Sequence, residues 1–159
     1  MIYLSSWGNL QTQNWLKSSP RLAPVRSLGS DADARLLLRI LLFALATRPL
    51  LFLNPTQLRW VLVRLNRVQN PGMHSDDVVA RHVEATLVLG HPLVADGCLS
   101  RGIVMHRFLS GNGSEVSLCF GVGRMNGDFA AHCWIVKDGE PYLEKTDPRL
   151  SFSAIHTIP

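Results

Sequence analysis

The sequence predicts an α+β domain in which helices come first and an antiparallel sheet comes last. Three observations support this fold class. Apolar residues recur at helical spacing between Asp31 and Leu109. From Glu115 onward, the residues alternate in the manner of strands. Within that second part, Asp138 and Gly139 stand between two alternating runs, and an Asp-Gly pair in this setting is a strong hairpin signal.

The first two predicted helices are separated by a proline and a capping residue. The first covers Asp31 to Thr47 and is expected to end before Pro49, because proline disrupts a helix interior. Asn54 followed by Pro55 then signals a new start, since these residue types favour the cap and the first turn. The second helix should run to Arg67. We expect it to bury two large side chains, Trp60 and Leu65.

Two further helices and three strands follow. The third helix is capped by Ser75 or Asp76 and ends at the Gly90 turn. The fourth begins near Cys98 and ends before the glycines at 111 and 113. Its inner face should include Leu99, Ile103, Met105 or His106, and Leu109. The strands are predicted at residues 115–123, 128–137 and 140–145.

Residues 1–29 are predicted to form an N-terminal extension, and residues 30–159 the single domain. The first segment has several Ser, Gly and Pro residues and no clear period. Its tryptophans, Trp7 and Trp15, are candidates for anchoring it to the domain or to a partner.

The charge is unevenly distributed along the chain. Residues 1–70 contain nine Lys or Arg and two Asp, a formal charge of +7, whereas the rest contains seven basic and ten acidic residues, a formal charge of −3. The basic residues are mixed with leucines, and no nucleic-acid-reading motif is present, so nucleic acid is not a predicted partner. A basic helical half could also face an anionic membrane or an acidic peptide, but the pattern favours solvated arginines on amphipathic helices.

The sequence predicts a cytoplasmic protein without a transmembrane segment. The N-terminus lacks the features of a secretory signal. The most apolar stretch, Leu36 to Leu53, is interrupted by Arg39, Arg48 and Pro49. Three cysteines in a cytosolic chain are expected to stay reduced.

Cys98 and His132 are the candidate catalytic pair. Cys98 follows Asp96 and Gly97 at a predicted helix start, where backbone N–H groups and the helix dipole favour a thiolate. His132 lies on a predicted strand, with Cys133 on the opposite face. That alternation disfavours a zinc site, and no cofactor is predicted. Cys133 and Cys119 are expected to be inert core thiols.

An acid on the next strand would orient the histidine. A helix-start cysteine, a strand histidine and then an acid is the order found in a large class of thiol catalysts. Asp138 is assigned to the turn. Glu144 ranks above Asp147, which stands beside Pro148 and is also a turn candidate.

Three stretches resemble the transglutaminase-like cysteine peptidases that mature lasso peptides: "GCLSRGIVMHRFL", "LCFGVGR" and "FAAHCWIVKDGEPYLE". That family has a Cys-Leu helix start, a Gly-Val-Arg-like strand end and an Ala-His-Ala-Trp-Val strand before an acidic-Gly turn. The resemblance covers roughly residues 32–147. It implies a transglutaminase-like, papain-like fold with Cys98 as nucleophile and His132 as general base. Glu144 stands where the family usually has Asp.

The resemblance also implies a role and partners. The substrate would be a ribosomally synthesised precursor peptide, from which the enzyme removes the leader. A separate leader-recognition protein is expected to act with it, and a lasso cyclase is a further candidate partner. The first two helices could dock the recognition protein or its bound leader, with Leu41, Phe43 and Phe52 as possible contacts. Two alternatives remain: acyl transfer to an amine, and an inactive peptide-binding domain.

Overall fold

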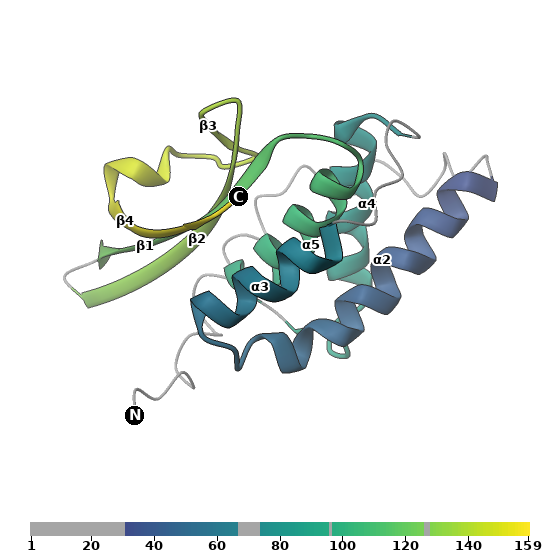
Figure 1. Ribbon diagram of the computed structural model, residues 1–159, viewed down its shortest axis with the longest axis horizontal. Helices are drawn as coiled ribbons and strands as arrows, with labels where there is room; N and C mark the ends of the chain where they lie inside the picture. Colours follow the sequence, from purple (N-terminus) through teal and green to yellow (C-terminus); the bar gives the residue numbers. More distant parts are fainter. Residues whose placement is uncertain (1–30, 67–73, 96, 126–127) are drawn as a thin grey trace.

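The computed structural model describes residues 31–66, 74–95, 97–125 and 128–159. The predicted α+β order is confirmed, because the four described α-helices precede an antiparallel sheet and lie together on one side of it (Figure 1). The helices are α2 (Asp31–Leu50), α3 (Pro55–Asn66), α4 (Asp76–Leu89) and α5 (Cys98–Gly111). The strands are β1 (Val116–Met125), β2 (Asp128–Lys137), β3 (Glu140–Tyr142) and β4 (Phe152–Ile158). The predicted extension, residues 1–29, lies outside the described residues.

Helix α2 is longer than the sequence predicts. It continues through Pro49 to Leu50, and the N–H of Leu51 bonds to the carbonyl of Thr47 at 3.2 Å. The missing N–H of Pro49 removes only one bond from the last turn, so the prediction that the helix ends before this proline is wrong. Within the described residues, no helix has the length and apolarity needed to cross a membrane.

Helix α3 begins as predicted and buries a different face. The N–H of Gln57 bonds to the side chain of Asn54 at 2.8 Å, and the Gln57 side chain accepts the Asn54 N–H at 3.1 Å. The buried residues are Leu58 and Leu62, one turn apart. Trp60 and Leu65 are exposed, by 65% and 36%, so the prediction that they are buried is wrong. Only the narrow face that carries the two buried leucines reaches the core.

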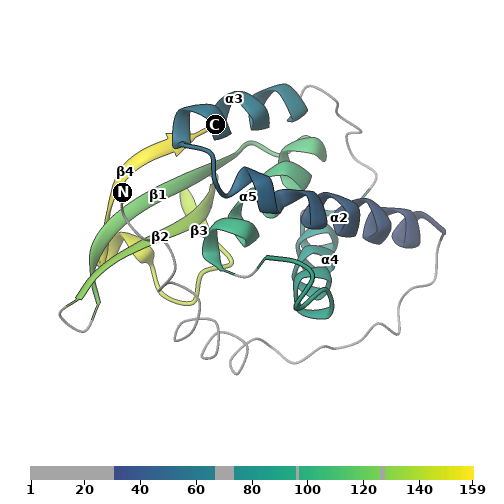
Figure 2. The ribbon, with the colours of Figure 1, turned by 90° about the horizontal axis from the view of Figure 1, so that it is seen from below.

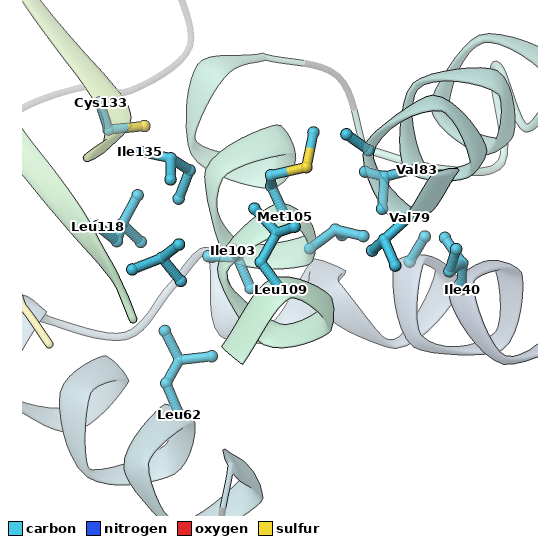
Figure 3. Close-up of a cluster of buried hydrophobic side chains, with 14 of the residues drawn as sticks. Ile40, Leu62, Val79, Val83, Ile103, Met105, Leu109, Leu118, Cys133 and Ile135 are labelled. Carbon is cyan, nitrogen blue, oxygen red and sulfur yellow. The ribbon is translucent and has the colours of Figure 1, made fainter. Parts of the chain in front are cut away.

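Helix α5 runs through the middle of the domain. It lies between the sheet and the other helices, and Figure 2 shows α2 and α4 beside it. Both Met105 and His106 are buried, and Ile103 and Leu109 are fully covered, as predicted. Figure 3 shows Ile103 beside Leu118 and the sheet residues, with Met105 directed toward α4. Helix α5 therefore contacts both the sheet and the other helices in the core.

Glycine at position 102 allows α5 to lie close to the sheet. A Cβ there would be 2.7 Å from Cδ1 of Leu118 and 3.5 Å from Sγ of Cys133. Because Leu118 is fully buried, little free space is available for it to move away. The close approach brings the first turn of α5 to strand β2.

The sheet has the order β3-β2-β1-β4, and every described pairing is antiparallel. The β2–β3 turn is confirmed at Asp138 and Gly139, whose φ angles of 52° and 82° suit a type I′ turn. The last predicted strand, residues 140–145, pairs only as far as Tyr142, because Leu143 turns the chain at φ 58°. Strand β4 was not predicted.

Removing the side chain of Leu62 should be much more harmful than removing that of Trp60. Leu62→Ala is expected to lower the free energy of unfolding by about 2–5 kcal/mol, because it leaves a cavity in the core. Trp60→Ala should cost less than about 1 kcal/mol, since its observed partner is the Arg64 guanidinium, 5.6 Å from the ring centroid. Chemical denaturation measures both values, and equal losses would contradict the assignment of the buried face.

Candidate active site

Cys98 is the first residue of α5, as the sequence predicts. Gly97 caps the helix with φ 113°, a conformation that favours glycine. The side chain of Cys98 is partly buried against the core, and no acidic residue stands in the first turn. The thiol therefore lies where the helix dipole stabilises negative charge.

His132 and Cys133 both influence the Cys98 thiol, although their side chains point to opposite faces of β2. Strand β3 pairs with β2 only at residues 135–137, so the two side chains lie beyond this pairing. The imidazole of His132 lies next to the rings of Trp134 and Phe152, with centroids at 6.0 and 5.4 Å. These rings keep the imidazole partly buried at the strand edge.

The pKa of the Cys98 thiol is well below its ordinary value. The largest cause is a hydrogen bond with the side chain of Cys133, and burial opposes it. A hydrogen bond and the positive charge of His132 lower the pKa further. Conversely, the hydrogen bond with Cys98 and burial raise the pKa of Cys133 far above the ordinary value, so Cys133 stays protonated. It is buried in the core, as predicted, but its hydrogen bond with the Cys98 thiol means that it is not the inert thiol the sequence suggests.

His132 interacts with Glu144. Nε2 of the imidazole lies 3.4 Å from Oε2 of the carboxylate. Burial lowers the pKa of His132, but the hydrogen bonds and charges of Cys98 and Glu144 outweigh it and raise the pKa to about 9. At neutral pH the imidazole is therefore protonated and faces a thiolate and a carboxylate.

The second ring nitrogen of His132 is available to Cys98. Nδ1 is buried, and its contact with Cys98 is too long or too bent to count as a full hydrogen bond among the described residues. The Cys98 thiol is nevertheless close enough to shift the pKa of the ring. Hydrogen bonds between catalytic groups are often long until substrate binds. We therefore assign Nδ1 to Cys98 and Nε2 to Glu144.

The structure brings Glu144, and not Asp147, to His132. Asp147 caps the short helix η3 (Pro148–Leu150): its side chain accepts the N–H of Arg149 at 2.9 Å and forms an ion pair with the same residue at 2.8 Å. Asp138 lies in the β2–β3 turn, as expected. The acid that ranked first in the sequence is thus the one beside the imidazole.

Arg101 and Glu84 complete the charged cluster, and sequence reasoning did not identify their contacts. The Arg101 guanidinium binds Glu84 at 2.8 Å and Glu144 at 3.0 Å. The spacing offers one signal, since Arg101 follows Cys98 by three residues and so shares its helix face. The position of Glu84 on α4 depends on tertiary packing. In the described parts of the chain, no group of His, Cys, Asp or Glu side chains could hold a metal ion.

The comparison with known families agrees with the fold. A family model described as "Transglutaminase-like superfamily" matches residues 41–157, a range that contains Cys98, His132 and Glu144. No curated protein and no solved structure matches the chain.

The pKa values predict how Cys98 reacts with iodoacetamide. Because the pKa of the Cys98 thiol lies well below its ordinary value, Cys98 should react as a thiolate at a pH where an ordinary cysteine, with a pKa of about 8.5, is almost entirely a thiol. His132→Ala should slow this reaction, because removing the imidazole raises the pKa of Cys98. Mass spectrometry of the peptide that contains Cys98 measures the rate.

Urea-unfolded protein provides the control, since its three cysteines are freely accessible. If Cys98 in the folded protein reacted at this pH no faster than the unfolded cysteines, the thiolate assignment would be wrong.

Proposed function

Because the chain belongs to the transglutaminase-like superfamily, we propose that it is a cysteine peptidase that removes the leader from a ribosomally synthesised lasso peptide precursor. The superfamily indicates chemistry of the cysteine peptidase or acyltransferase type. The precursor, as substrate, rests on the sequence resemblance at Cys98-Leu99, at residues 121–124 and at residues 131–136.

One observation carries the proposal: Cys98 is the first residue of α5 and interacts with His132, whose Nε2 lies 3.4 Å from the Glu144 carboxylate. The pKa of the thiol is lowered and that of the imidazole is raised to about 9. This pattern is that of a thiolate-imidazolium ion pair, the resting state of an activated thiol nucleophile. We assign Cys98 as nucleophile, His132 as general base and acid, and Glu144 as the group that orients His132.

In the first half-reaction, the Cys98 thiolate attacks the scissile carbonyl carbon of the precursor. The first-turn N–H groups of α5, which lack partners within a helix, hold the oxyanion that forms. As the C–N bond breaks, the imidazolium of His132 gives its proton to the leaving amine of the core peptide. The leader then remains bound to Cys98 as a thioester.

In the second half-reaction, neutral His132 removes a proton from water, and the resulting hydroxide attacks the thioester. As the C–S bond breaks, the Cys98 thiolate is released and the leader leaves as a carboxylic acid, which gives its proton to the solvent. The proton that His132 took from water stays on the ring and restores the ion pair. Glu144 keeps Nε2 of the ring directed away from Cys98, so that Nδ1 performs both proton transfers. An amine in place of water would give the transglutaminase-like alternative through the same thioester.

We also propose a separate leader-recognition protein as partner, with a lasso cyclase acting on the freed amine. Helices α2 and α3 and the turn between them carry exposed apolar side chains among arginines, which suits a docking surface. The exposed residues are Leu38, Leu42, Leu45, Phe52, Trp60, Val63 and Leu65. Of the contacts suggested by sequence, Phe52 is 87% exposed, whereas Leu41 and Phe43 are partly buried against the core. We place the reaction in the cytosol, where thiols stay reduced.

The proposed activity predicts a defined pair of products. Mass spectrometry of a precursor peptide, incubated with this protein and its recognition partner, should show cleavage at the leader–core junction. Cys98→Ala should abolish the cut, and His132→Ala should slow it by about 10²–10⁴-fold, the usual contribution of general acid–base catalysis.

The masses also separate the alternatives. Transfer to an added amine without hydrolysis would identify an acyltransferase. An intact precursor in the presence of the partner would favour a binding domain and refute the peptidase.

The docking proposal predicts that charge at Trp60 weakens partner binding. Trp60→Glu should raise the Kd for the recognition protein about thirtyfold, the loss expected for an aromatic residue that contributes about 2 kcal/mol. Calorimetry measures the Kd. The matched control is Ile155→Glu on β4, because Ile155 has the same 65% exposure. Equal effects of the two changes would rule out a docking role for α3.

A further inference from the structure

We infer that Arg101 is a positioning residue: it holds Glu144 against His132, and Glu84 offsets the charge of Arg101, so that the negative charge of Glu144 still acts on His132. The inference rests on the proposed Cys98 and His132 chemistry and adds to it two residues from outside the proposed triad.

Arg101 forms three directed contacts around Glu144. Its Nε donates to Oε1 of Glu84 at 2.8 Å, and its Nη1 donates to Oε1 of Glu144 at 3.0 Å. Its Nη2 donates to the carbonyl oxygen of Leu143 at 3.3 Å. The three charged side chains are between 12% and 24% exposed, so water screens them little. A guanidinium can make these contacts together because its donors lie in one rigid plane.

The two oxygens of the Glu144 carboxylate have different partners. Oε1 binds Arg101, and Oε2 faces Nε2 of His132 at 3.4 Å. Without Arg101, the carboxylate could rotate or swing toward solvent, since it follows a turn rather than a paired strand. Fixing one oxygen fixes the other.

Arg101 also binds the backbone that carries Glu144. Leu143 has φ 58°, a left-handed conformation that costs energy for any residue with a side chain. Surrounding contacts must maintain such a conformation. The bond from Arg101 to the Leu143 carbonyl is one of these contacts. Arg101 therefore positions both the turn and the side chain that follows it.

Glu84 preserves the negative charge at the site. An arginine paired with Glu144 alone would cancel the field that stabilises imidazolium. With Glu84 ionised, the group of Glu84, Arg101 and Glu144 carries a net charge of −1. Burial raises the pKa of Glu84 and Arg101 opposes this rise. The contact of Arg101 with Glu84 at 2.8 Å favours the ionised form of this carboxylate.

The charged and titratable groups around His132 come from several elements. Helix α4 contributes Glu84, helix α5 contributes Cys98 and Arg101, β2 contributes Cys133, and the segment after β3 contributes Glu144. The test must therefore change position and charge separately. Arg101→Lys keeps the positive charge but cannot reproduce three directed contacts. Glu84→Gln keeps the shape but removes the counter-charge.

The experiment measures the pKa of His132 by NMR titration of its ring, assigned by comparison with His132→Gln, and kcat and KM for precursor cleavage. In Arg101→Lys and in Glu84→Gln, the pKa of His132 should fall from about 9 toward its ordinary 6.5. In Arg101→Lys, kcat should fall by about 10²-fold, the cost of misplacing a reacting group by about an ångström. KM should change little, because neither residue is assigned to substrate binding.

Arg149→Lys is the matched control, since Arg149 also binds two acids, Asp147 and Glu140, but lies outside the site. Thermal unfolding checks that each variant folds. The inference is wrong if Arg101→Lys and Glu84→Gln leave the His132 pKa at about 9, or if kcat falls no more than in Arg149→Lys. If Arg101→Lys does not fold, Glu84→Gln decides the result.

The same measurements separate this inference from the proposed substrate. The NMR titration needs no precursor. A lowered His132 pKa in an enzyme that leaves the precursor intact would support the positioning role and reject the leader peptidase. If the wild-type protein cleaved the precursor and the variants kept the same His132 pKa and kcat, the result would support the leader peptidase and reject the positioning role.

Discussion

The site depends on the close packing of α5 against the sheet at Gly102. A methyl group there would lie 2.7 Å from Leu118, so only a glycine permits the observed spacing without movement of the core. That spacing sets the height at which the first residue of the helix meets β2. Cys98 thereby reaches two successive residues of one strand, His132 and Cys133, which regular alternation would direct to opposite faces. The packing of α5 against the sheet therefore also determines where Cys98, the proposed nucleophile, lies.

The charged groups of the site tolerate burial because each faces a partner. An isolated buried ion is costly, and a buried ion pair survives only with good geometry and further hydrogen bonds. Here the Cys98 thiolate faces the His132 imidazolium, and Arg101 lies between two carboxylates. The protonated Cys133 adds a hydrogen bond to the thiolate rather than a competing charge. Reactivity and burial are compatible for this reason.

Membership in the transglutaminase-like superfamily indicates chemistry of the cysteine peptidase or acyltransferase type and does not identify the acceptor. In enzymes of this type, water and amines attack the same thioester, so the geometry of the proposed triad does not distinguish hydrolysis from transfer. Substrate choice depends instead on surfaces beyond the triad. The apolar residues on α2 and α3 are the exposed features best suited to a protein or peptide partner.

The sequence alone determined the features that depend on near neighbours. These include the Asn54 cap, the Asp138-Gly139 turn and the position of Cys98 at a helix start, because each involves contacts within a few residues. Tertiary structure decided the rest. The packing of distant elements determines which face of α3 is buried and how β4 pairs. It also brings Arg101 to Glu84 and Glu144, which lie 17 and 43 residues away in the sequence. Glu144 rather than Asp147 reaches His132 because Leu143 turns the chain there and Arg149 holds the other acid, and no local pattern encodes such long-range geometry.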